Sequence, residues 1–275
     1  MTKFGRMLAF VVDMVRIYQE RRVSRSAAAF AYFLTLSIFP LLICAVAILA
    51  RFELGLAGLF DDIWAQDVVA AVLDYVEHVG SVPSQLIVTA SLTVLFTSGS
   101  ASFRALAKSM EDMQGKPRYR GIWGFIFSLV FSLVLLFTMY FSVLMITTGG
   151  WLMETVEELT GIYGLAVFWN RIRFWLLFVV AVVVVHLLYV FTAPKKSRVR
   201  RLPGALLATL ALLVGSMIFS LFMGASARYP LIYGSLASFI LLMVWAYACG
   251  NILIVGNLFN HVLHKRKHLA TEEDL

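Results

Sequence analysis

Long apolar runs alternate with short charged segments along the whole chain. Six runs are long enough to cross a bilayer, because a spanning helix needs about 20 mostly apolar residues. They cover residues 27–50, 85–107, 121–148, 172–193, 203–223 and 234–260. The pattern predicts an all-α, polytopic membrane protein with three parts. These are a cytoplasmic amphipathic helix over 1–26, a six-helix transmembrane domain over 27–260 and a cytoplasmic tail over 261–275.

Basic residues fall on alternate sides of these six runs. The N-terminal segment, the second and fourth connections and the tail together carry 19 of the 23 lysines and arginines, and the other connections carry 4. Lysine and arginine concentrate in the cytoplasmic loops of membrane proteins. The asymmetry therefore predicts that both termini face the cytoplasm, which agrees with an even number of spans.

Three segments outside the runs have an apolar face at helical spacing. At the N-terminus the apolar stripe consists of Phe4, Met7, Leu8, Val11, Val15 and Tyr18. Residues 58–79 and, less regularly, residues 151–168 repeat the pattern, with acidic residues on the other face. Helices of this kind lie along a membrane surface. We expect the N-terminal helix to rest on anionic lipid headgroups and the other two to cover the bundle or lie at the lipid interface.

Composition excludes most soluble classes of protein. Hydrophobic residues make up 61% of the chain and charged residues 14%, against about 45–50% and about 25% in soluble domains. The net charge of +7 follows the predicted cytoplasmic connections, so we expect no nucleic-acid partner. Cys44 and Cys249 lie inside apolar runs, where a thiol is a small packing residue.

No metal or other cofactor is expected. His261, His264 and His268 share one helical face, as metal ligands can, but the cations at 265–267 lie between them. Those cations would repel a divalent ion.

Polar residues inside or beside the runs are the candidates for a substrate path. Pro40 removes one helical hydrogen bond, so its helix either kinks without consequence or opens a cavity. Ser98 and Ser100 belong to a run of small residues that leads to Arg104. The Arg104 guanidinium either extends to the headgroup level or binds an anion such as a phosphate.

Further candidates lie deeper in the runs and on the predicted outer side. They are His186, Asn251, Asn257, Arg171, Arg173 and Arg228. The structural interpretation is that His186 is neutral and bonded to a neighbouring helix, and that the asparagines bond between helices. The functional interpretation is that His186 titrates and that the asparagines form a polar path. The arginines either pair with outer acidic residues or form a cationic collar for an anionic headgroup.

Three stretches of the chain carry a family resemblance. They are Ser26-Ala-Ala-Ala-Phe-Ala-Tyr-Phe-Leu-Thr-Leu-Ser-Ile-Phe-Pro40, Arg201-Leu-Pro-Gly-Ala205, and Tyr229-Pro-Leu-Ile-Tyr-Gly-Ser-Leu-Ala237 running on to Trp245 and Gly256. As a set, in this order and spacing, they resemble the YihY/virulence factor BrkB family of bacterial inner-membrane proteins. Tyr229 and Tyr233 of the third stretch join the candidate residues.

The resemblance implies a six-helix bundle in the bacterial cytoplasmic membrane and a role in envelope lipid handling. The family has also carried a ribonuclease label, but this sequence shows no metal cluster, catalytic dyad or soluble nucleic-acid domain. Relatives often have Gly-Ala-Glu near the end of the last span, where this chain has Gly256-Asn257-Leu258. A role for that glutamate is therefore not carried over.

We expect a non-enzymatic transporter or conduit for an anionic lipid or related amphiphile. The alternative is a non-transporting membrane scaffold or assembly protein. Membrane lipids are the expected partners, and a protein partner or a homo-oligomer stays open.

Overall fold

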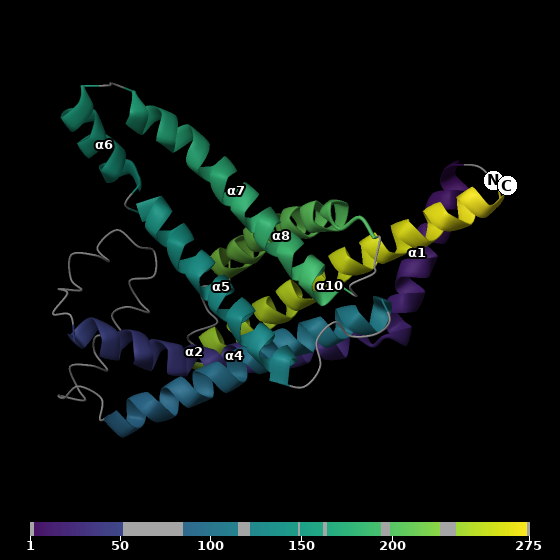
Figure 1. Cartoon of the computed structure of the whole chain (residues 1–275), viewed down its shortest axis with the longest axis horizontal. Coiled ribbons are helices and arrows are strands. Elements are labelled where there is room, and N and C mark those ends of the chain that lie inside the picture. Colours follow the sequence, from purple (N-terminus) through teal and green to yellow (C-terminus); the bar gives the residue numbers. More distant parts are fainter. Residues whose placement is uncertain are drawn as a thin grey trace. The chain divides into compact units, whose positions relative to one another are not determined.

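The computed structural model describes residues 3–51, 85–114, 122–147, 149–161, 164–193, 199–225 and 235–273. Every regular element in these ranges is an α-helix, as the apolar pattern predicts (Figure 1). The helices are α1 (Lys3–Glu20), α2 (Val23–Arg51), α4 (Gln85–Gln114), α5 (Ile122–Thr147), α6 (Gly149–Thr160), α7 (Leu165–Thr192), α8 (Leu202–Ala225) and α10 (Ser235–Glu273). The predicted amphipathic segment 58–79 lies outside the described residues, as do Arg228, Tyr229 and Tyr233.

Four of the described helices are long and apolar enough to cross a membrane. The qualifying segments are Gln85–Met113 in α4, Val167–Thr192 in α7, Leu202–Met223 in α8 and Phe239–Arg266 in α10. Shorter apolar stretches, Val23–Ile38 and Ile122–Val134, belong to α2 and α5. The prediction of an all-helical chain with membrane-spanning helices is confirmed, whereas six spans and cytoplasmic termini stay predictions.

Helix α8 shows why these helices require a lipid environment. Leu210, Met217 and Leu221 on this helix are 51%, 68% and 75% exposed. Only 11% of its most apolar window is buried within the structure. An exposed apolar surface of this extent is stable against lipid chains and unstable in water.

The chain divides into two compact units, and each is described by itself. The first consists of Met1–Thr35, Ser100–Ser132 and Phe178–Leu275, and the second of Leu36–Gly99 and Leu133–Leu177. Helices α2, α4, α5 and α7 therefore contribute one part to each unit. In the first unit, α8 and α1 both pack against α10.

The first turn of α8 is held to α10 by the side chain of Asn260. Its Oδ1 accepts a hydrogen bond from the Gly204 N–H at 2.7 Å, and its Nδ2 donates to the Arg201 carbonyl at 2.9 Å. Pro203 suits this first turn because it has no N–H that needs a partner. A Cβ on Gly204 would overlap the Gly256 carbonyl oxygen, so the two backbones meet at glycines. The second stretch of the family resemblance is thus a helix start docked on α10.

Helix α7 connects α10 to α4 in the same unit. The buried Tyr189 hydroxyl donates to the Leu253 carbonyl of α10 at 2.7 Å. Three residues later, the buried Thr192 hydroxyl lies 3.6 Å from the Met110 sulfur of α4. These two contacts place the C-terminal end of α7 between its neighbours.

Helix α1 packs one face on α10 and leaves the middle of its apolar stripe exposed. Arg266 Nε donates to Asp13 Oδ2 at 3.0 Å, and the rings of Phe10 and Phe259 meet edge to face at 5.4 Å. The exposed stripe includes Met7, Leu8, Val11 and Val15. Helix α1 therefore has one apolar exposed face and ends at Glu20, before the predicted boundary at residue 26, and its cytoplasmic position stays a prediction.

In the second unit, the predicted amphipathic segment 151–168 is divided between two helices. Helix α6 ends at Thr160 and α7 begins at Leu165, and Gly161 and Gly164 between them have φ values of +69° and +100°. The Gly161 N–H bonds to the Glu157 carbonyl at 2.9 Å, which closes the last turn of α6. A glycine in the left-handed region commonly ends a helix in this way. The prediction of one continuous amphipathic helix over 151–168 is wrong for this reason.

Candidate functional site

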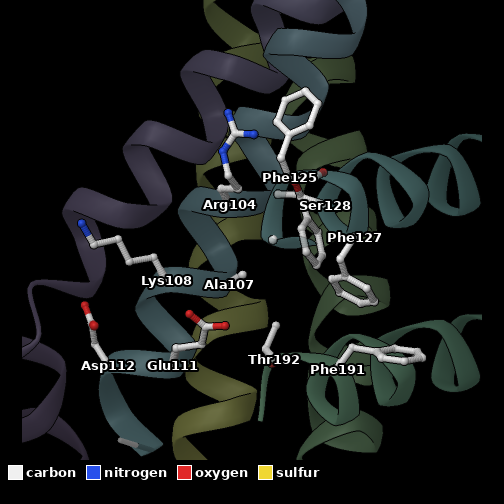
Figure 2. Close-up of a pocket in the computed structure, with 12 residues that line it drawn as sticks. Arg104, Ala107, Lys108, Glu111, Asp112, Phe125, Phe127, Ser128, Phe191 and Thr192 are labelled. Atoms are coloured by element: carbon white, nitrogen blue, oxygen red, sulfur yellow. The ribbon is translucent and has the colours of Figure 1, made fainter. Parts of the chain in front are cut away.

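An open pocket of about 700 Å³ is lined by α4, α5 and α7 in the first unit (Figure 2). Among the described residues, its charged lining comes from one helix, α4, and consists of Arg104, Lys108, Glu111 and Asp112. Its aromatic lining consists of Phe103, Phe125, Phe127 and Phe191. The charged residues follow one another at steps that keep them on one side of α4.

The Arg104 side chain is held at the start of α5. Its Nη1 donates to Ser100 Oγ at 2.6 Å, and the hydroxyls of Ser100 and Ser128 lie 2.7 Å apart. Ser128 also donates to the Phe125 carbonyl at 2.8 Å. The guanidinium lies over the Phe125 ring, 5.1 Å from its centroid. Arginine has several N–H donors in a planar fork, and the bond to Ser100 uses one of them.

Small residues on α4 make this approach of α4 and α5 possible. Ser98, Ser100 and Ser102 are all buried, and Ser102 donates to the Phe30 carbonyl of α2 at 3.3 Å. Small and hydroxyl residues let helices approach closely in a membrane. Neither Ser98 nor Ser100 lines the pocket, so the contribution of Ser100 to the site is to orient Arg104.

An aromatic cluster forms the wall opposite the charged face of α4. The ring centroids of Phe127 and Phe191 lie 4.9 Å apart, and those of Phe103 and Phe131 lie 4.6 Å apart. Such contacts between rings stabilise the wall beyond the burial of its surface. The pocket therefore offers ionic groups and an apolar surface to the same ligand.

The asparagine candidates on α10 bond between helices or lie in the core. Asn251 accepts a hydrogen bond from the Tyr18 hydroxyl of α1 at 2.7 Å and donates to the Tyr247 carbonyl at 2.9 Å. Burial, with a smaller contribution from Tyr247, raises the pKa of the Tyr18 hydroxyl. Asn257 is fully buried. Interhelical hydrogen bonding is confirmed for Asn251, as it is for Asn260 above.

His186 lies within α7 and Pro40 within α2. The buried Nδ1 atom of His186 has no hydrogen-bond partner within the part of the chain that the structure describes. Helix α2 continues through Pro40. The Thr35 hydroxyl of the same helix donates to the Ala31 carbonyl at 2.8 Å.

Arg171 and Arg173 both lie inside α7, which begins at Leu165, earlier than the predicted span. The Arg173 guanidinium lies over the Phe174 ring, 4.9 Å from its centroid. Among the described residues, neither arginine forms the expected ion pair with the acidic residues of α6. Those acidic residues, Glu154, Glu157 and Glu158, line a second open pocket of about 490 Å³.

Metal-ligating side chains do not gather in the described ranges. Across residues 3–51, 85–114, 122–147, 149–161, 164–193, 199–225 and 235–273, no group of three or more such side chains is found.

Sequence reasoning selected Arg104 but missed Lys108, Glu111, Asp112 and Ser128. The signal that identifies the three charged residues is their helical spacing from Arg104.

Comparison with known proteins identifies the family. The YfkH protein of Bacillus subtilis (strain 168), whose name describes it as ribonuclease-like, is 26% identical over 271 residues, covering 96% of this chain and 98% of that protein. A UPF0761 membrane protein of Vibrio vulnificus (strain YJ016) is 25% identical over 279 residues, covering 98% and 86%. A UPF0761 membrane protein of Vibrio cholerae (El Tor Inaba N16961) is 31% identical over 120 residues, covering 43% and 38%.

No solved structure matches the chain. The family described as Virulence factor BrkB matches residues 14–275. This match includes all the residues of the Arg104 pocket, and it agrees with the helices that are apolar enough to span a membrane. The chain therefore belongs to the virulence factor BrkB family of membrane proteins.

Proposed function

We propose that this protein is a transporter or conduit for an anionic lipid or related amphiphile in the bacterial cytoplasmic membrane. The observation that carries the proposal is the Arg104 pocket, which joins an exposed guanidinium to hydroxyl and aromatic surfaces on a helix of spanning length. In this proposal the chain crosses the membrane six times and keeps both termini in the cytoplasm, with residues 27–260 as its transmembrane domain.

The position of Arg104 along α4 supports contact with a headgroup. Arg104 follows Gln85, the first residue of α4, by 19 residues, which corresponds to about 28 Å of helix. The hydrocarbon core of a bilayer is about 30 Å thick. If the core begins near Gln85, the Arg104 guanidinium reaches the level of the lipid phosphates on the other side. The basic connection that follows α4 makes this the cytoplasmic side.

The chemistry of this end of the pocket suits a phosphate. A guanidinium fork matches the oxygens of a phosphate and is charged at any physiological pH. Gly124, in the first turn of α5, also lines the pocket, and the start of a helix carries a partial positive charge. The Phe103, Phe127 and Phe191 rings would lie beside the apolar part of the amphiphile.

At the outer side of the membrane, we propose that cationic side chains receive the headgroup. The candidates are Arg171 and Arg173 on α7, together with Arg228. Arg171 is exposed, and an exposed cation at the outer interface attracts a phosphate without burying a charge in hydrocarbon.

Lipid movement by the purified protein tests the proposal. The protein is reconstituted into liposomes that contain a headgroup-labelled anionic phospholipid, and an impermeant quencher added outside reports how fast inner-leaflet label becomes accessible. We expect faster access than in protein-free vesicles. Arg104→Ala should slow it by about tenfold or more, the effect of one charge-assisted hydrogen bond.

Arg25→Ala is the matched control, because Arg25 is an exposed arginine of the same unit and does not line the pocket. It should move lipid at the wild-type rate. Equal rates for wild type, Arg104→Ala and empty vesicles would refute passive lipid movement. A stoichiometric protein partner in detergent extracts would then favour the scaffold alternative.

A further inference from the structure

Helix α1 has two faces with different surroundings. The face that contains Phe10, Asp13 and Tyr18 is held on α10 by a contact between rings, an ion pair and a hydrogen bond. The other face carries neighbouring apolar side chains that are each at least half exposed. They are Met7, Leu8, Val11, Val12 and Val15, and we call them the α1 patch. Steps of three and four residues keep them together on one side of the helix.

The exposure of the α1 patch calls for a partner outside the described residues. A single apolar residue on a surface is ordinary, but a contiguous apolar face marks contact with a membrane or with another molecule. Lipid chains around a spanning helix explain the exposed face of α8. Helix α1 is not among the described helices that are apolar enough to span a membrane. Its patch therefore requires a different explanation.

The chain turns sharply between α1 and α2. Helix α1 ends at Glu20, α2 begins at Val23, and Arg22 between them has a φ of +49°. The Arg22 N–H donates to the Gln19 carbonyl at 3.1 Å, which closes the last turn of α1. Figure 1 shows α1 running steeply across the direction of the first part of α2. Because the apolar stretch of α2 begins at Val23, α1 lies beside the point where α2 enters a bilayer and crosses that direction, as a surface helix does.

Exposed cations lie at this corner between α1 and α2. Arg21 and Arg22 are both exposed. The two acidic residues of α1 each have a cationic partner, because Asp13 pairs with α10 and Glu20 lies 3.5 Å from the Arg16 guanidinium. Arg21 and Arg22 therefore give the corner a net positive charge. Such a charge beside an apolar helix face attracts anionic lipid headgroups.

We propose that α1 is a docking surface for the anionic glycerophospholipids of the leaflet at which α2 begins. The α1 patch lies among the upper parts of the acyl chains, and Arg21 and Arg22 bind lipid phosphates, because a guanidinium fork matches phosphate oxygens. Charge favours lipid over a second copy of this chain, because a second copy would bring further arginines to a corner that is already cationic. This surface is separate from the Arg104 pocket, so the inference does not depend on lipid movement by the protein.

Fluorescent labels on single cysteines test the orientation of α1. In full-length protein with both native cysteines replaced by alanine, bimane is attached to Val11→Cys, Val15→Cys or Glu20→Cys. Each protein is reconstituted into vesicles of phosphatidylcholine and phosphatidylglycerol. Nitroxides at two depths along the acyl chains measure the depth of the label, and iodide measures its access to water. We expect the labels at positions 11 and 15 to lie about 5–10 Å below the headgroups. Glu20 is opposite Val11 on the helix, so its label should be quenched by iodide.

Two results of this experiment would overturn the inference. Equal access of iodide to all three labels would mean that the α1 patch faces water. Protection of positions 11 and 15 from both iodide and the nitroxides would mean that protein covers the patch. Disulfide cross-linking between copies of the Val11→Cys protein would then identify a second copy of the chain as the occupant.

The preference for an anionic headgroup is measured with the label at position 15. The vesicles keep one composition, and a nitroxide near the headgroup end of an acyl chain is carried by either phosphatidylglycerol or phosphatidylcholine. We expect the phosphatidylglycerol nitroxide to quench about fivefold more effectively, the effect of about one arginine near the membrane surface. Arg21→Gln/Arg22→Gln should remove this preference. The control Arg200→Gln changes an exposed arginine of the same unit outside α1 and should retain it. Equal quenching by the two lipids in the wild-type sequence, or a preference that survives the double variant, would overturn the assignment of the corner to anionic lipid.

Discussion

Replacing Asn260 with alanine tests how α8 is docked on α10. The change removes the acceptor for the Gly204 N–H and a donor to the Arg201 carbonyl, at a side chain that is 1% exposed. The Arg201 carbonyl keeps its bond from the Ala205 N–H at 3.1 Å, so most of the cost falls on the Gly204 N–H. A buried unpaired group costs about 1–3 kcal/mol, and bonds between membrane helices reach about 1.7 kcal/mol. We therefore expect the free energy of unfolding to fall by about 2 kcal/mol.

Thermal unfolding in detergent measures this loss. A thiol-reactive dye suits the chain because it has only two cysteines, the buried Cys44 and the half-buried Cys249 of α10. A loss of about 2 kcal/mol corresponds to a Tm about 4–8 °C lower. Amide hydrogen exchange should increase most in the first turn of α8, because the Gly204 N–H there loses its acceptor, Asn260 Oδ1.

Asn251→Ala is the matched control, since it removes an asparagine of the same helix. Asn251 bonds to the half-buried Tyr18 and to a carbonyl of its own helix, so we expect a loss under about 1 kcal/mol. If Asn260→Ala and Asn251→Ala lowered the Tm equally, or if amide exchange in α8 stayed at the wild-type rate, the docking argument would be refuted.

Three further changes test the packing around α10. Tyr189→Phe removes the bond to the Leu253 carbonyl and should lower the Tm by about 2–4 °C; an unchanged Tm would contradict this. Gly204→Val places a side chain where Gly256 and Asn260 lie, so it should abolish monodisperse protein on gel filtration, and a normal yield would contradict the close approach. Asp13→Asn removes a partly exposed ion pair and should speed amide hydrogen exchange in α1 by about fivefold or less. High salt should produce the same increase in the wild-type protein. If neither the variant nor high salt changed the exchange rate, the ion pair would not hold α1 on α10.

The helices were predictable from the sequence because the spacing of apolar residues that identifies a helix lies within the helix itself. The stripe from Met7 to Val15 repeats at helical spacing, and in the structure it is the exposed face of α1. The opposite face was not predictable, because Asp13 and its partner Arg266 are 253 residues apart. Local periodicity identifies a helix and an apolar face, but a contact over that distance depends on the packing of the whole unit.

The candidate site was partly predictable for the same reason. Arg104 stands out as a cation after a run of small residues, whereas Glu111 and Asp112 resemble the solvated end of any spanning helix. The Ser100–Ser128 contact depends on the register of α4 against α5, which no pattern within either helix determines. Asn260 was visible as a polar residue near the end of a run, but its role in the start of α8 required the position of Gly204.

The α8 docking and the Arg104 pocket are connected through α7, and this determines how the variants should be interpreted. Tyr189 bonds to α10, Thr192 contacts Met110 of α4, and Phe191 between them lines the pocket. Loosening α10 can therefore reach the pocket by moving α7, and it should affect lipid binding and Tm together. Arg104 is exposed, so Arg104→Ala should lower lipid binding while the Tm stays within about 2 °C of wild type. A binding loss that always follows the Tm would mean that the arginine supports the fold, and the headgroup site would have to be sought elsewhere.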